Sequence, residues 1–271
     1  MTRAPFSVTA AEALPNAVKA CVCSGETVAI EGFGQRIPFA AVHEIIRQRI
    51  GDLHLVRMGV DLVGDQLIGA GLVSALTFSW AGNPGFGALR RFRAAVERGQ
   101  PRSLTLEELS HGSLLAAYRA GAAGLPFAVT RSFLDSDLVA HCSLVAPIAC
   151  PFSGERLHAV RAIRPDVAIL HAQRADRMGN VELRGVVGAE RYAAFAASRT
   201  LVTVEEIIEE ITPRPGSVFV PAEVNTTVVC APRGAYPSGV DGYYDRDDDA
   251  YAEWDALSGD DARFARWLAT V

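Results

Sequence analysis

The alternation of short apolar segments with amphipathic segments, joined through glycine-containing loops, constrains the fold of this chain most strongly. The residues TVAIE (27–31), LHLVRM (53–58) and LVSALTF (72–78) are rich in β-branched and other apolar side chains, as expected for buried strands. Apolar residues at three- and four-residue spacing predict helices over residues 39–50 and 88–99. Strands that alternate with helices indicate a parallel sheet covered by helices.

The same alternation continues to the end of the chain. We expect a strand over 103–109, a helix over 113–124, strands over 127–129, 166–173 and 200–207, and helices over 247–257 and 261–271. A T-x-x-E capping box at Thr9 and Glu12 predicts a short helix towards Val22. Residues 134–160 contain a segment with two prolines and predict no single regular element. Residues 1–271 are therefore expected to form one open, layered α/β domain.

Three glycine-containing loops follow the first three predicted strands. They are GFGQRIP (32–38), MGVDLVGD (58–65) and SWAGNPGFG (79–87). Ligands of open α/β sheets bind at the carboxyl ends of the strands, so these loops are expected to converge on one edge. Glu107 and Glu108 offer either a carboxylate for such a site or exposed charges at a helix start.

Composition excludes several classes of protein. The chain of 271 residues carries 31 acidic and 26 basic residues, and a net charge of −5 argues against a nucleic-acid partner. It has no uninterrupted apolar run of roughly 18 residues and no signal-peptide pattern at its start, so we expect a cytoplasmic protein without a membrane partner. Five cysteines include one C-x-C pair without a matching second pair, which favours buried, inert thiols over a zinc site.

The common catalytic motifs are absent. The G-x-G of the first loop is followed by proline where a dinucleotide fingerprint requires a third glycine, and there is no phosphate-binding G-x-x-x-x-G-K-[ST] motif. Asp245, Asp247 and Asp249 have calcium-loop spacing, but alanine replaces the required glycine and glutamate, so a solvated helix start is the simpler interpretation and no metal site is expected. No nucleophile, base and orienting group can be assembled. The loops therefore resemble half of an active site, which raises the question of a second chain.

Five segments, in order from about residue 20 to 250, resemble the A (alpha) chains of family I CoA-transferases of the glutaconate CoA-transferase type. They are SGETVAIEGFGQRIPFAAVHEIIR, FSWAGNPGFGALRRFRAAVERG, LEELSHGSLLAAYRAGAAGLPFAVTRSFLDSD, ILHAQRADRMGNVELRG and APRGAYPSGVDGYYDRD. The resemblance implies the layered α/β fold that these enzymes share with ribose-5-phosphate isomerase.

The resemblance also implies an activity and a partner. Enzymes of this family move CoA between carboxylic acids by ping-pong covalent catalysis, through a thioester of CoA with a glutamate. That glutamate belongs to the B (beta) subunit, so no catalytic side chain is expected in this chain. Coenzyme A thioester is a substrate, and no permanently bound cofactor is expected.

Matching the motifs residue by residue assigns backbone and pocket walls to this chain. The resemblance makes Gly32 and Gly34 backbone donors to an oxyanion, with Pro38 fixing the exit of their loop. It assigns substrate or CoA binding to Phe33, Ser79, Trp80, Gly82, Asn83, Glu108, Ser110 and Arg131.

Two departures from the family pattern leave alternatives open. Glu31 replaces the glycine common before G-F-G, which puts a carboxylate near the pocket. His111 stands where a related branch, which hydrolyses a ring in steroid breakdown, has an acid. The alternatives are a CoA-ester or ring-opening C–C hydrolase subunit of the same fold, and a non-catalytic ligand-binding homologue.

Overall fold

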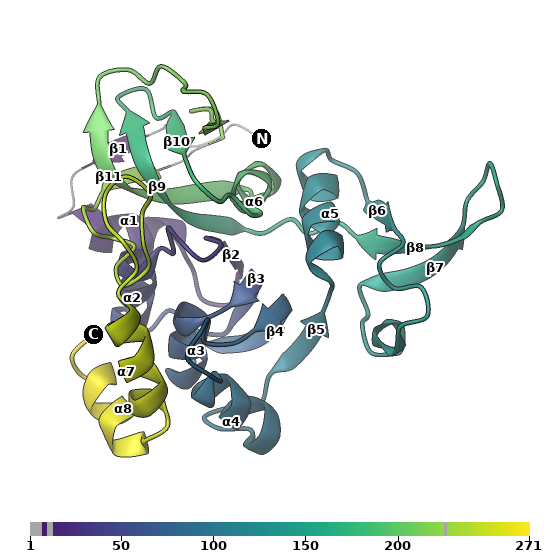
Figure 1. Cartoon of the computed structure of the whole chain (residues 1–271), viewed down its shortest axis with the longest axis horizontal. Coiled ribbons are helices and arrows are strands. Elements are labelled where there is room, and N and C mark those ends of the chain that lie inside the picture. The colour runs from purple at the N-terminus through teal and green to yellow at the C-terminus, as the bar shows by residue number, and fades with distance from the viewer. Residues whose placement is uncertain (1–6, 10–12, 225–226) are drawn as a thin grey trace.

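A largely parallel β-sheet forms the centre of the computed structural model, which describes residues 7–9, 13–224 and 227–271 (Figure 1). In spatial order its main strands are β1 (Ser7–Thr9), β13 (Thr227–Cys230), β11 (Arg199–Ile208), β9 (Val167–Asp176), β2 (Thr27–Ile30), β3 (Leu53–Val60), β4 (Val73–Ala81) and β5 (Thr105–Glu108). Each neighbouring pair in this order is parallel. Two short strands, β10 (Val181–Leu183) and β12 (Val218–Val220), extend β9 in antiparallel orientation. The predicted open α/β fold is confirmed.

Helices cover both faces of the sheet, which explains why consecutive residues of its central strands are buried rather than alternately buried and exposed. The helices are α1 (Leu14–Cys21), α2 (Phe39–Arg47), α3 (Leu62–Gly69), α4 (Arg90–Arg98), α5 (His111–Ala122), α6 (Glu190–Ala196), α7 (Asp248–Ser258) and α8 (Asp261–Leu268). Val28 and Ile30 of β2 join one core with α1, α2, α3 and the C-terminal helices, whereas Ala29 joins the opposite core with α5 and α6.

A second, antiparallel sheet projects from the α5 side of the molecule (Figure 1). Its strands are β6 (Phe127–Thr130), β8 (Arg156–Arg161) and β7 (Val145–Ala149), in that order. The segment 134–160 indeed forms no single element, since a 3-10 helix over Asp137–Ala140 precedes the β7–β8 hairpin. Pro147 is tolerated because β7 is an edge strand.

Several predicted boundaries are wrong. Thr9 lies in β1 rather than at a helix start, and α1 begins at Leu14 with a proline in its first turn, while Glu12 falls outside the described residues. The segment predicted as the loop 58–65 is the end of β3 and the start of α3. The third strand, β4, continues to Ala81, so the loop that was predicted to begin at Ser79 begins at Gly82.

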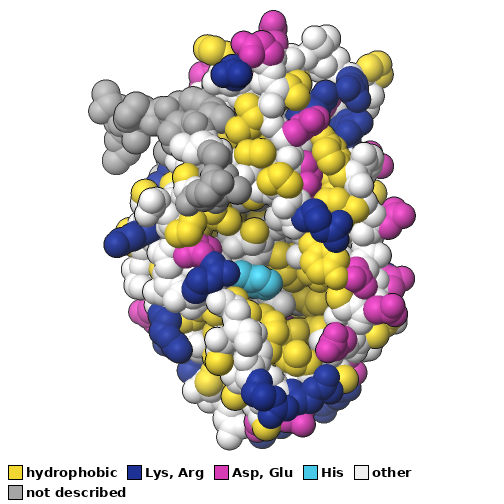
Figure 2. Space-filling view, turned by 90° about the vertical axis from the view of Figure 1, so that its left-hand side faces the viewer, with side chains coloured by type: hydrophobic (Ala, Val, Ile, Leu, Met, Phe, Trp, Pro, Cys, Tyr) yellow, Lys and Arg dark blue, Asp and Glu magenta, His cyan; other side chains and the backbone are white. Residues whose placement is uncertain are grey.

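Basic and acidic side chains are interspersed with apolar ones on the face shown in Figure 2. Asp247 caps α7 by accepting a hydrogen bond from the Ala250 N–H, as expected for a helix start. Within the described ranges, no group of His, Cys, Asp and Glu is placed to hold a metal ion, and no helix is long and apolar enough to cross a membrane. The thiols are free; Cys21 and Cys142 are buried as expected, but Cys23 is exposed.

Candidate active site

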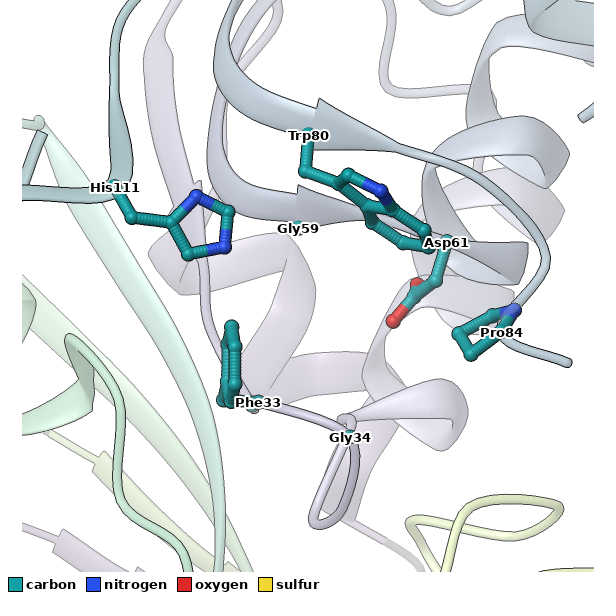
Figure 3. A pocket seen from close by; sticks show the side chains of 8 residues that line it. Phe33, Gly34, Gly59, Asp61, Trp80, Pro84 and His111 are labelled. Carbon is teal, nitrogen blue, oxygen red and sulfur yellow. The ribbon is translucent and has the colours of Figure 1, made fainter.

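The carboxyl ends of β2, β3 and β4 enclose a cavity of about 300 Å³. It is lined by Gly32, Phe33, Gly34, Gly59, Asp61, Trp80, Pro84 and His111. The rings of Phe33, Trp80 and His111 and the carboxylate of Asp61 face a common space (Figure 3). The three strand-end segments therefore converge, as the sequence predicts for an open α/β sheet.

The glycine loop, residues 32–38, presents the Phe33 ring and the backbone of Gly32 and Gly34 to this cavity. Gly32 has φ +153, and a Cβ there would lie 2.7 Å from the Arg36 carbonyl oxygen, so the tight turn excludes other residues. Gly34 has φ +72, with open space around the position of a Cβ. Among the described residues, the N–H groups of Gly32 and Gly34, the two expected donors, and that of Phe33 between them have no hydrogen-bond partner. Three successive backbone donors are thus free for a ligand.

Trp80 forms the opposite wall of the cavity. Its side chain is 43% exposed and projects from the end of β4. Gly82 allows the indole to lie close, because a Cβ there would be 2.6 Å from Trp80 Cζ2. Asn83 is buried behind this wall, where its side-chain amide donates to the Tyr251 carbonyl oxygen at 2.8 Å. Gly82 and Asn83 therefore shape the wall without lining the cavity.

Besides Gly82 and Asn83, four further residues assigned to substrate binding by the resemblance do not line the cavity in this chain. Ser79 Oγ donates to the Met58 carbonyl oxygen at 2.7 Å, between neighbouring strands. Ser110 caps α5 by accepting from the Ser113 N–H at 3.1 Å. Glu108 is exposed at the end of the edge strand β5, and Arg131 forms an exposed, bidentate ion pair with Glu155.

Conversely, Gly59, Asp61 and Pro84 line the cavity; they lie in the predicted strand-end loops, but none of them was assigned a role from the sequence. Asp61 accepts a hydrogen bond from the Val63 N–H and so caps α3, a helix that the sequence analysis missed. An aspartate followed by an apolar run is a helix-start signal that would have located it. His111 packs edge-to-face on Phe33, with ring centroids 5.8 Å apart.

A fully buried arginine, Arg57, lies behind the glycine loop. One terminal nitrogen donates to the Ile30 carbonyl oxygen at 2.6 Å. The other donates to Asp61 Oδ2 at 2.6 Å and to the Gly32 carbonyl oxygen at 3.3 Å. The guanidinium of Arg57 therefore forms a buried ion pair with Asp61, which lines the cavity.

Glu31 does not supply a carboxylate to the cavity. Its side chain is 2% exposed, and its Oε1 accepts hydrogen bonds from the Tyr118 hydroxyl at 3.0 Å and the Met58 N–H at 3.2 Å. Burial raises the pKa of Glu31 from its ordinary 4.5 to about 8, and the attraction of Arg57 offsets only part of that rise. Glu31 is thus neutral at pH 7 and is the proton-carrying member of a buried network.

The far end of the glycine loop is also anchored. Arg36 is fully buried and donates to the carbonyl oxygens of Arg184 and Val186 and to Glu190 Oε1, the last at 2.9 Å. The Arg36 N–H donates to the Gly239 carbonyl oxygen at 2.9 Å. Segments distant in the sequence therefore fix the loop.

Comparison with known proteins places this geometry in a family. The model of the coenzyme A transferase family matches residues 11–231. The chain is 50% identical over 255 residues to the A chain of the 3-oxoadipate CoA-transferase of Pseudomonas knackmussii, covering 94% of this chain and 90% of the relative. The crystal structure of glutaconate coenzyme A-transferase from Acidaminococcus fermentans superposes with a TM-score of 0.88 at 33% identity, covering 95% and 86% of the two chains. A cholesterol ring-cleaving hydrolase IpdA subunit of Mycobacterium tuberculosis is 29% identical, covering 83% and 80%.

Proposed function

Since this chain belongs to the coenzyme A transferase family, as an alpha chain of the glutaconate CoA-transferase type, we propose that its cavity is one half of an active site that a B subunit completes. The free N–H groups of the glycine loop carry this proposal. The chain supplies backbone donors and aromatic walls, and the B subunit supplies the attacking glutamate. Phe33 and Trp80, 37% and 43% exposed, lie where the partner would close the cavity.

The reaction divides between the two chains. The partner's glutamate attacks the acyl-CoA carbonyl, and the negative charge that develops on the carbonyl oxygen is stabilised by N–H donors of the glycine loop. CoA leaves as a thiolate, giving an acyl-glutamyl anhydride. The thiolate then attacks the glutamyl carbonyl and releases the first acid as its carboxylate. A second carboxylate reverses the sequence and takes the CoA.

We propose a short dicarboxylic or 3-oxo acid as the acyl group. A cavity of about 300 Å³ is at the lower end of the range for small-molecule sites, so it suits a short chain between Phe33 and Trp80. The relative at 50% identity is named for 3-oxoadipate. CoA thioesters are cytoplasmic metabolites, and a cytoplasmic location is part of the same proposal.

Hydrolysis is the less supported alternative. The relatives that bear the hydrolase name are only 29% identical to this chain. His111 lines the cavity at the position where the family resemblance implies an acid in that branch. An imidazole packed on Phe33 does not reproduce a carboxylic acid.

The assay combines this chain with its co-expressed B subunit, C4 to C6 dicarboxyl-CoA donors and a panel of acceptor acids. Transfer produces a new thioester, resolved by chromatography, without net release of free thiol. Hydrolysis instead releases CoA in step with loss of donor, and that product would overturn the transferase assignment. Mutation of the B subunit's glutamate is expected to abolish turnover.

A further inference from the structure

We propose that Arg57 is a positioning residue, which orients the Gly32–Phe33 peptide so that its N–H faces the substrate carbonyl. The inference rests on the proposed function of the cavity. Arg57 lines none of the cavity itself and is fully buried beneath it. Its contacts nevertheless lie on the backbone that forms the cavity.

The geometry of the peptide bond links the two groups. Gly32 and Phe33 are joined by a trans peptide, in which the carbonyl and the N–H point in opposite directions. The Gly32 carbonyl oxygen accepts from Arg57 at 3.3 Å, on the buried side of the loop. The Phe33 N–H therefore points away from Arg57, and among the described residues it has no hydrogen-bond partner.

The other contacts of Arg57 prevent the guanidinium from moving. Its second terminal nitrogen donates to the Ile30 carbonyl oxygen, one strand away, at 2.6 Å. Asp61, which caps α3, accepts at 2.6 Å. A planar guanidinium serves these three acceptors from two fixed nitrogens, whereas an ammonium is a single point donor. Lysine would keep the charge and lose this geometry.

The loop needs such a restraint because its own residues are permissive. Gly32 and Gly34 both have positive φ, and their backbone is free to adopt other conformations when unrestrained. Arg36 anchors the far end of the loop through acceptors at 184–190 and does not contact the Gly32 carbonyl. Within the described part of the chain, Arg57 donates the hydrogen bond to that carbonyl.

The test compares Arg57→Lys with a matched control in the assembled two-chain enzyme. Arg174→Lys is the control, because Arg174 is also buried and paired with a carboxylate, but its side chain donates to Glu182 rather than to the glycine loop. For Arg57→Lys we expect kcat per assembled enzyme to fall about 10- to 100-fold, with KM within about threefold, since misplacing a group by about 1 Å costs up to 10²-fold. Arg174→Lys is expected to lower Tm with kcat within about twofold.

A crystal structure of the Arg57→Lys enzyme provides a readout that does not depend on activity. We expect the Gly32 carbonyl to turn from its buried position. An unmoved carbonyl, or an unchanged kcat, overturns the proposal. A fall in kcat of equal size in Arg174→Lys also overturns it, as does failure of both Arg57→Lys and Arg57→Gln to assemble, which would assign Arg57 to folding alone. Should the wild-type enzyme transfer no CoA, the proposed function fails, whereas the position of the carbonyl still decides the role of Arg57.

Discussion

Replacing Glu31 by glutamine tests whether a buried proton makes stability depend on pH. The folded protein holds this carboxyl with a pKa of about 8, against an ordinary 4.5 in the unfolded chain. Between these pH values the folded state keeps a proton that the unfolded state has released, so the free energy of unfolding falls as pH rises. Below pH 4.5 the group contributes no such loss, and above pH 8 the loss no longer grows.

The magnitude follows from the size of the shift. One pKa unit corresponds to about 1.4 kcal/mol, so the complete loss is about 5 kcal/mol, of which about 2 kcal/mol falls between pH 6 and pH 8. Glutamine has nearly the same shape, and its carbonyl oxygen can accept from the Tyr118 hydroxyl and the Met58 N–H as Glu31 does. Glu31→Gln should therefore remove the pH-dependent loss and keep the packing.

Thermal unfolding of the assembled enzyme at pH 6 and pH 8 measures this difference. For a chain of this size, about 2 kcal/mol corresponds to a change in Tm of about 4–8 °C. The Tm of Glu31→Gln minus the Tm of wild type should therefore be about 4–8 °C larger at pH 8 than at pH 6. Glu97→Gln, which removes a carboxylate from a surface ion pair with Arg93, is the control and should show no such change. A Tm difference independent of pH would refute the assignment of a buried, neutral Glu31.

Three further predictions concern the cavity and the partner. The purified chain alone should transfer no CoA, because the attacking glutamate belongs to the B subunit; robust turnover by the single chain, abolished by changing Glu31 or Glu108, would contradict this division of roles between the two chains. Gly34→Val should lower kcat of the assembled enzyme about 10²- to 10³-fold, because valine disfavours the φ of +72 at this position and the loop donor is displaced even though the space around Gly34 is open. A lower Tm with unchanged kcat would remove the loop from the active site. Trp80→Ala should raise KM for acyl-CoA about tenfold, a loss of about 1.4 kcal/mol of binding, with kcat little changed; an unchanged KM would exclude Trp80 from the substrate wall.

The sequence predicted the parallel sheet because its core strands are unambiguous. Every residue of β9 is buried, so β9 needed no alternation, and the apolar run VAIL at its start was enough to locate it. The α3 helix was missed because its eight residues follow β3 after a single aspartate and contain two glycines. A strand-end loop and a short buried helix have the same composition there. Of the antiparallel sheet, the strand over 127–129 was predicted, but β7 and β8 were missed because they are short and partly exposed and lie outside the main sheet.

The candidate site was predictable in its backbone and only partly in its side chains. Gly32 and Gly34 have positive φ, and the motif that contains them marks that requirement directly. Arg57 lies inside a predicted strand, where an arginine gives no signal of its contacts. Those contacts join β2, β3 and the cap of α3, and they depend on the register of β2 and β3, which the sequence pattern does not specify.

The position of β9 between β2 and β11 has a consequence for how the chain is made. β2 is an early strand of the chain, yet one of its edges pairs only with β9, which begins at Val167. Until the ribosome has produced β9, the β2–β5 half of the sheet presents an unpaired strand edge to the cell. The Arg36 anchor forms later still, because its acceptors lie at 184–190 and Gly239. The glycine loop therefore reaches its functional form only near the end of synthesis, and a chain truncated before β9 should collect in inclusion bodies.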